Sequence, residues 1–308
     1  MAEKAFVREV GLRDGLQLVR TMLPTERKLE WIRRAAAAGI PEIEVTSFVP
    51  AKVVPQFADA AEVAAGAVAM GGFSVAALVP NLRGAERAVE VGVGKITCVL
   101  SVSESHNLAN VRRSTDESIE DFGRILAMRD ERAPGRVAVG VALATSFGCT
   151  IEGAVPEARV VSIARRLLAM GADEIVVADT VGYGNPAAVR RLMAAILAEA
   201  GTVPVACHFH DTRGLGLANV TAAVEVGVRA FDASLGGLGG CPFAPGATGN
   251  IDTEDTAFLL ESMGFDTGID IEALVELRVV EGWLPGEAFQ GAIARAGLPK
   301  MFRPAAAA

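Results

Sequence analysis

Aromatic side chains and histidines are scarce in this sequence. Only 5% of the 308 residues are aromatic and three are histidines, whereas 51% are hydrophobic. The core must therefore be built mainly from Ala, Val, Leu and Ile. Thirty-three glycines predict many tight connections. This composition is typical of a globular protein and excludes a disordered one.

An excess of positive charge is also absent. The net charge is −8, from 29 basic and 37 acidic residues, which argues against a nucleic-acid surface. No apolar run reaches membrane-spanning length, and the charged first residues differ from a signal peptide. The four cysteines lack CxxC spacing, so they do not indicate a disulfide framework. We expect a soluble protein of a reducing compartment, the cytoplasm. The cysteines are Cys98, Cys149, Cys207 and Cys241.

Short β-rich runs alternate with amphipathic helical segments along most of the chain. Eight such units predict an α/β fold, a single (β/α)8 TIM barrel over about residues 5–265. A C-terminal helical extension, 266–304, is expected to pack across the barrel, so that 1–308 form one domain. A doubly wound open sheet is the alternative, but it gives no reason to stop at eight strands. The predicted strands are 6–10, 42–48, 73–79, 95–102, 137–145, 174–178, 205–209 and 230–235; the predicted helices include 26–38, 85–91, 118–132, 157–170, 187–199 and 218–226.

The expected strand ends carry polar side chains, and catalytic groups of such barrels collect at those ends. His208 and His210 are two residues apart on a strand, so both imidazoles face one side and could chelate a cation. A hydrogen-bonded pair without metal is the alternative. Asp14 and Asn250 could complete the ligand set, or could be a helix cap and a loop-end amide. Two nitrogens and two oxygens favour Mg²⁺ or Mn²⁺, and Zn²⁺ is less favoured without thiolates.

Three further residues are candidates for catalysis. Arg13 could stabilise a developing enolate oxygen, or could form a surface salt bridge. Glu44 could orient Arg13, or could belong to an ion pair inside the barrel. Cys241 lies in the loop 236–250, GGLGGCPFAPGATGN, and could exchange a proton with a carbanion, although an incidental loop cysteine is the alternative. The glycine pattern does not support dinucleotide binding.

Several stretches of this chain resemble the 3-hydroxy-3-methylglutaryl-CoA lyases, within the superfamily of metal-dependent barrel lyases, aldolases and Claisen synthases. They run in order from about residue 6 to 265, and RDGLQ, HxHDT and GGLGGCP together are highly specific. The matching stretches are EVGLRDGLQ (9–17), EIEVTSFVPAKVVPQFADA (42–60), VPNLRGAE (79–86), GCTIEG (148–153), ADTVGYG (178–184), HFHDTRGLGLAN (208–219) and GGLGGCPFAPGATGN (236–250).

The resemblance implies a divalent cation, usually Mg²⁺, bound at Asp14, His208, His210 and Asn250. It implies cleavage of a 3-hydroxyacyl-CoA to acetyl-CoA and a keto acid. Asp14 or a histidine would accept the hydroxyl proton, Arg13 would stabilise the enolate and Cys241 would deliver a proton. It also implies a homo-oligomer, a dimer or larger. The residues expected to contact the acyl-CoA thioester are Gln17, Arg20, Ser47, Asn81 and Thr180.

This chain departs from the sequence motifs usual in these lyases at three places. GLRDGLQLV replaces GPRDGLQNE, SVSESHNLANVRRS introduces His106, and HDTRGLGLAN introduces Arg213 and Leu215. We interpret the chain as a divergent paralogue and leave its acyl substituent open. Two alternatives remain: a Claisen-type synthase of the isopropylmalate or homocitrate kind, and a non-catalytic barrel that binds acyl-CoA.

Overall fold

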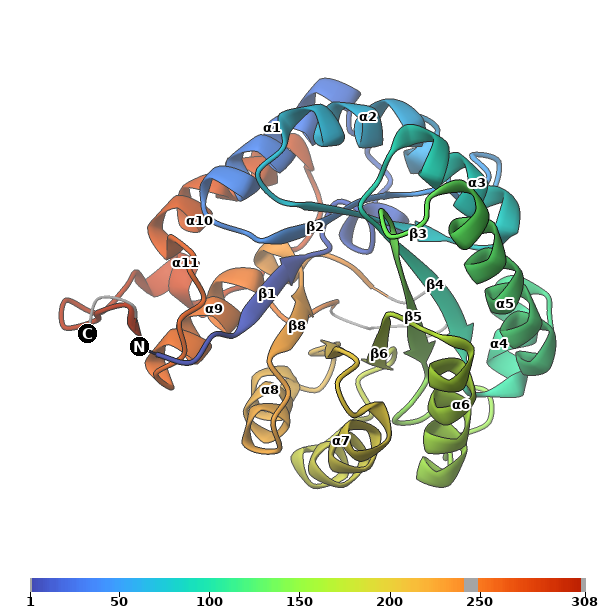
Figure 1. Cartoon of the computed structure of the whole chain (residues 1–308). Coiled ribbons are helices and arrows are strands. Elements are labelled where there is room, and N and C mark those ends of the chain that lie inside the picture. The colour runs from blue at the N-terminus through green and yellow to red at the C-terminus, as the bar shows by residue number, and fades with distance from the viewer. Residues whose placement is uncertain (1, 241–248, 306–308) are drawn as a thin grey trace.

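Eight parallel strands close into a barrel in chain order, with β8 paired to β1, in the computed structural model of this protein (Figure 1). The structure describes residues 2–240 and 249–305. The TIM-barrel prediction is confirmed, and each predicted strand boundary lies within about two residues of the observed one. The strands are β1 (Phe6–Glu9), β2 (Glu42–Ser47), β3 (Ser74–Val79), β4 (Lys95–Ser101), β5 (Ala138–Ala144), β6 (Glu174–Asp179), β7 (Val205–Phe209) and β8 (Ala230–Ala233).

Helices form a ring around this barrel, because parallel strands that are buried on both faces need a covering layer (Figure 1). The six helices predicted from periodicity are all present, although α3 and α5 begin three residues earlier than expected. They are α1 (Thr25–Ala37), α3 (Leu82–Val91), α5 (Thr115–Arg132), α6 (Glu157–Met170), α7 (Pro186–Ala200) and α8 (Gly216–Glu225).

Local sequence signals explain where these helices begin and end. Ser114 and Glu117 form a capping box at the start of α5, in which each side chain accepts a hydrogen bond from the other residue's backbone N–H. Asn185 caps α7 ahead of Pro186 at the first helical position. Gly171 ends α6 with a positive φ of 99°, a conformation that glycine adopts without a steric penalty.

Three of the described α-helices were not predicted from the sequence, and one of them, α9 (Thr253–Ser262), follows β8. The other two, α2 (Ala60–Met70) and α4 (Glu104–Val111), follow strand ends, where they form part of the βα connections. Most of α2 is Ala, Val and Gly, so polar and apolar residues give no helical period. Ser103 is the N-cap of the short α4, and its side chain accepts a hydrogen bond from the His106 backbone N–H.

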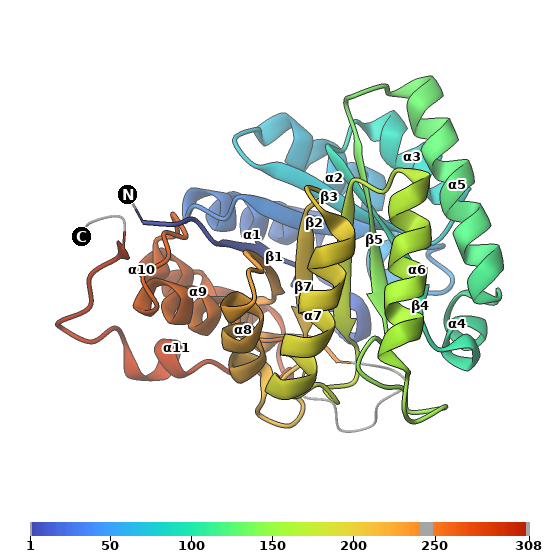
Figure 2. The ribbon, with the colours of Figure 1, turned by 60° about the horizontal axis from the view of Figure 1, so that its bottom comes forward.

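Among the described residues, three further α-helices follow β8 and gather at one side of the barrel, beside α1 and near both chain termini (Figure 2). They are α9 (Thr253–Ser262), α10 (Ile271–Leu277) and α11 (Ala292–Ala296). Buried Leu260 and Leu274 pack into the core that they share with the barrel. Among the described residues, no helix combines the length and the apolar character that crossing a membrane requires.

Candidate active site

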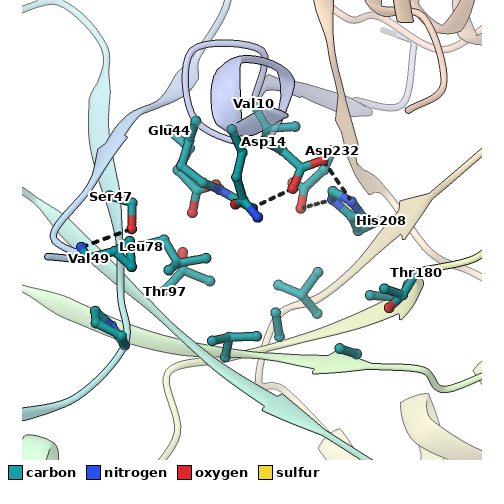
Figure 3. A pocket seen from close by; sticks show the side chains of 18 of the residues that line it. Val10, Asp14, Glu44, Ser47, Val49, Leu78, Thr97, Thr180, His208 and Asp232 are labelled. Atoms are coloured by element: carbon teal, nitrogen blue, oxygen red, sulfur yellow. Dashed lines mark hydrogen bonds and ion pairs between the residues drawn. The ribbon is translucent and has the colours of Figure 1, made fainter. Parts of the chain in front are cut away.

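A cavity of about 230 Å³ opens at the carboxyl ends of the strands and continues down inside the barrel. Its wall brings together side chains from β1 to β8 and from the loops that follow them (Figure 3). Leu78, Val99, Ala142 and Val176 supply an apolar surface, whereas ionisable groups gather on one side. Polar groups that converge in a largely apolar cavity are typical of a ligand site.

His208, His210 and Asp14 converge on one side of this cavity. His208 lies on β7, His210 follows that strand, and Asp14 precedes the 3-10 helix η1 (Gly15–Leu18). The two Nε2 atoms are 3.2 Å apart, and Asp14 Oδ2 lies 3.7 Å from His210 Nε2 and 4.0 Å from His208 Nε2. This cluster could hold a metal ion, because one potential ligand atom from each residue lies within 4.8 Å of the other two.

Asn250 lies beside these three residues, at a bridge that pairs it with His210. Its Nδ2 donates to Asp14 Oδ2 at 2.8 Å and to the Leu238 carbonyl at 3.1 Å. Its Oδ1 is buried and has no hydrogen-bond partner among the described residues. A buried amide oxygen without a partner is costly, and a metal ion would satisfy it.

Glycine is required where the loop passes Asn250. Gly239 has a φ of 138°, and a Cβ at this position would lie 2.6 Å from Asn250 Nδ2. A larger residue would therefore be strained in its backbone and would displace the amide. The GGLGG sequence thus has a local structural purpose beside the candidate metal centre.

Arg13 joins Asp14 to Glu44. Its Nη1 donates to Asp14 Oδ1 at 2.5 Å, and its Nε donates to Glu44 Oε2. All three are largely buried, so the surface salt bridge considered for Arg13 is not what the structure contains. Burial opposes the charged form of Asp14, but Arg13 and the two histidines outweigh it and hold the pKa of Asp14 well below its usual range. Burial raises the pKa of Glu44 despite Arg13.

Asp232, on β8, was not identified from the sequence. Its Oδ2 lies 3.3 Å from His208 Nδ1, and Figure 3 shows the two side chains together, with Asp14 beside them. A carboxylate at one ring nitrogen directs the other nitrogen of the imidazole towards the cluster. Burial lowers the pKa of His208, but Asp232 and Asp14 outweigh burial and raise it.

The predicted substrate residues occupy different surroundings. Gln17, Ser47 and Thr180 line the cavity, whereas Asn81 and Arg20 are not among its lining residues. The Asn81 side chain accepts a hydrogen bond from the Gly84 backbone N–H at 3.0 Å and caps α3, and Arg20 is exposed. Cys241 lies outside the described residues.

Two of the residues that depart from the usual lyase motifs, His106 and Arg213, are held by hydrogen bonds. His106 lines the cavity, and its Nδ1 lies 2.8 Å from Ser101 Oγ; burial lowers the pKa of the imidazole. Arg213 donates to the carbonyls of Val181 and Gly182 at 3.0 Å and stacks over Tyr183. Arg213 therefore connects the loops after β6 and β7 without lining the cavity.

Thr145 connects three strand ends on the far side of the cavity. It is a buried non-glycine residue with a φ of 60°, a conformation that costs free energy and is often found at functional sites. Its backbone N–H donates to Thr180 Oγ1 at 2.8 Å, and its Oγ1 accepts from the Ser103 N–H at 3.1 Å. The carboxyl ends of β4, β5 and β6 are thus held by neutral hydrogen bonds.

These features define a (β/α)8-barrel protein with a candidate metal centre at the mouth of the barrel. The chain belongs to the HMGL-like family, whose model matches residues 5–280. A hydroxymethylglutaryl-CoA lyase of Bacillus subtilis is 40% identical over 273 residues, which cover 89% of this chain and 90% of that protein. An (R)-citramalyl-CoA lyase of Chloroflexus aurantiacus is 41% identical over 283 residues, covering 89% and 88%.

Solved structures of relatives have the same fold over nearly their whole length. An HMG-CoA lyase from Acinetobacter baumannii, in complex with coenzyme A and 3-methylmalate, superposes with a TM-score of 0.90 at 41% identity and covers 98% of this chain and 97% of that one. An HMG-CoA lyase of Bacillus subtilis gives a TM-score of 0.90 at 38% identity, with 95% and 97% covered.

Proposed function

We propose that this protein cleaves a 3-hydroxyacyl-CoA thioester in a retro-aldol reaction that releases acetyl-CoA and a keto acid. Membership of the HMGL-like family, with relatives of about 40% identity that are carbon–carbon lyases, makes the chain a carbon–carbon lyase. Those relatives act on two different CoA thioesters, hydroxymethylglutaryl-CoA and citramalyl-CoA, so either compound is a candidate substrate.

A divalent cation fits the donor set at the mouth of the barrel. Asp14, His208, His210 and Asn250 would hold it, and the unpartnered Oδ1 of Asn250 is the observation that most favours an ion over a hydrogen-bonded pair of histidines. Two oxygens and two imidazole nitrogens favour Mg²⁺ or Mn²⁺. When bound, such an ion supplies Lewis-acid polarisation of substrate oxygens and lowers the pKa of a bound hydroxyl group.

Different residues of the site accept the proton and stabilise the negative charge that forms in this reaction. Asp14 or a histidine nitrogen accepts the hydroxyl proton, and the bond between the carbinol carbon and the thioester α-carbon breaks. Its electron pair moves into the thioester as an enolate, whose oxygen is stabilised by the guanidinium of Arg13. Glu44 fixes that guanidinium through its Nε, and Arg13 Nη1 contacts Asp14.

The remaining roles concern the substrate. We propose that the Cys241 thiol donates a proton to the enolate carbon and so completes acetyl-CoA. Gln17, Ser47 and Thr180, which line the cavity, would contact the thioester. We also propose that the protein works as a dimer or a larger homo-oligomer, which sedimentation of the purified chain tests.

The convergence of Asp14, His208 and His210 beside the unpartnered oxygen of Asn250 carries this proposal. The test is a panel of 3-hydroxyacyl-CoA thioesters incubated with Mg²⁺, including hydroxymethylglutaryl-CoA and citramalyl-CoA, with acetyl-CoA measured by mass spectrometry. We expect release from at least one thioester. Condensation of acetyl-CoA with a keto acid and no cleavage would indicate a Claisen-type synthase, and binding without turnover would indicate a non-catalytic acyl-CoA-binding barrel.

A further inference from the structure

The interior of the barrel below the histidines contains a layer of charged side chains, several of which line the cavity. In most TIM barrels, branched apolar residues occupy such layers. Here Arg8 and Lys95 meet three carboxylates, and all five residues belong to strands. Burying charges costs free energy even when they are paired, so a charged layer stabilises a barrel poorly. The carboxylates are Glu42, Glu174 and Asp232.

The backbone places Arg8, Asp232 and His208 in one row. Arg8 on β1 is the register partner of Asp232 on β8, and Asp232 is the register partner of His208 on β7. Neighbouring residues of one row lie side by side across adjacent strands. Asp232 therefore lies between Arg8 at one end of the row and the imidazole of His208 at the other.

The two oxygens of the Asp232 carboxylate have different partners, Arg8 and His208. Arg8 Nε and Nη2 lie 2.7 and 2.5 Å from Oδ1, and His208 Nδ1 lies 3.3 Å from Oδ2. Arg8 Nη1 donates to Glu174 at 2.7 Å, and Lys95 in turn contacts Glu174 and Glu42 at 2.7 Å. With Oδ1 engaged by the guanidinium, Oδ2 is the oxygen that faces His208.

We propose that Arg8 is a positioning residue of the metal centre: by fixing Asp232, it orients His208 so that Nε2 faces Asp14 and His210. A carboxylate only accepts hydrogen bonds, so it keeps the hydrogen on Nδ1 and leaves the Nε2 lone pair for a cation. This inference rests on the proposed function, because it requires that the cluster binds a metal ion. The proposal gives a role in metal binding to Arg8, which contacts neither the metal cluster nor the rim of the barrel.

The test measures Mn²⁺ affinity of the purified, metal-free protein by electron paramagnetic resonance, without substrate. Loss of such an orienting contact weakens metal binding by about 10-fold or more, so we expect Arg8→Met to raise the Mn²⁺ dissociation constant by about 10-fold. At saturating Mn²⁺, turnover per folded molecule should recover most of the wild-type value. A defect of folding alone would lower the folded fraction and leave the dissociation constant of the folded protein unchanged.

Lys95→Met is the matched control, because it also removes a buried cation from the layer but does not touch Asp232. We expect its Mn²⁺ dissociation constant to stay within about twofold of wild type, since the orienting contact is intact. If Arg8→Met does not fold, Arg8→Lys and Asp232→Asn keep the layer filled. Arg8→Lys loses the planar fork and should weaken Mn²⁺ binding about threefold, and Asp232→Asn should weaken it about 10-fold.

Two outcomes would overturn the proposal, and they are distinguishable. Equal Mn²⁺ affinity in wild type, Arg8→Lys and Asp232→Asn would remove the positioning role and leave the metal site in place. Failure of the wild-type protein to bind Mn²⁺ would refute the metal centre of the proposed function and the positioning role with it.

Discussion

On the side of the barrel mouth formed by β7, β8, β1 and β2, ionisable side chains contact one another in the interior. Arg13 bridges Asp14 and Glu44, and Asp232 contacts His208. On the opposite side, formed by β4, β5 and β6, the strand ends are joined through the backbone and hydroxyls of Thr145 and its neighbours. The first side is therefore held by contacts between ionisable groups, and the second by neutral hydrogen bonds.

The largest expected loss of turnover comes from removing a proposed metal ligand on the charged side. His208→Ala should lower turnover by about 1000-fold, because Lewis-acid stabilisation contributes several kcal/mol and each 1.36 kcal/mol is a factor of 10. Acetyl-CoA release, measured with the best thioester of the panel, gives the turnover. Metal content by mass spectrometry should fall in parallel, and a variant with full turnover would contradict the assignment of His208.

A smaller loss of kcat is expected when residue 13 keeps its positive charge but loses the planar guanidinium group. Arg13→Lys should lower kcat by about 100-fold, since the removal of one donor to a developing oxyanion typically has this effect. The ammonium cannot reproduce the fork that joins Asp14 to Glu44. Arg33→Lys, an exposed position on α1, is the control and should leave kcat unchanged. Equal kcat in both variants would exclude Arg13 from the reaction.

Glu9 extends the comparison, because it is a buried carboxyl that forms no ion pair with any described residue. Burial raises its pKa to about 7, although N–H and O–H donors of Leu235, Thr253 and Gly11 oppose this. A native-state pKa above the unfolded value of 4.5 means that Glu9 stabilises the fold fully below pH 4.5 and that this contribution is lost as the pH rises through 7.

Glu9→Gln should therefore flatten the pH dependence of stability. Between pH 5 and pH 8, the wild-type protein should lose about 2.5 kcal/mol more unfolding free energy than the variant, from 1.36 kcal/mol per unit of pKa shift. Urea unfolding at several pH values measures the difference. Parallel stability curves for the two proteins would contradict the raised pKa.

The smallest effect is expected between the two sides, at Asn81, which follows β3 and caps α3. Asn81→Ala should lower the free energy of unfolding by about 1 kcal/mol, as the loss of a helix cap does, and should leave KM unchanged. Asn185→Ala removes the equivalent cap of α7 and is the matched control. A rise in KM for Asn81→Ala alone would support the substrate contact expected from the sequence over a purely structural role.

The sequence predicted the barrel well because its strands and most helices have clear periodicity. It also placed Asp14, His208 and His210 at strand ends, and the structure brings these together. The helix α2 was missed because its Ala-rich sequence carries no polar and apolar period. Asp232 and Arg8 were missed for a different reason: their contact with each other depends on the pairing register of β8 with β1, which no local pattern specifies.

Asn81 shows where sequence position alone leaves two roles open. Its position after a strand suggested a substrate contact, yet a residue at that position also precedes a helix and is a favourable N-cap. Strand-end location alone therefore does not separate a cap from a ligand-binding residue. In the structure, the Asn81 side-chain oxygen accepts a hydrogen bond from Gly84 of its own helix. The substrate contact stays a prediction, which the KM of the Asn81 variant tests.

Metal-dependent cleavage is the central claim, and acetyl-CoA release before and after removal of metal tests it most directly. Protein stripped with EDTA and dialysed would be assayed with the most active thioester of the panel, with no metal added and then with Mg²⁺ or Mn²⁺ restored. We predict that release is lost on stripping and returns on addition of the cation. Undiminished release from protein shown by mass spectrometry to contain no metal would contradict the account.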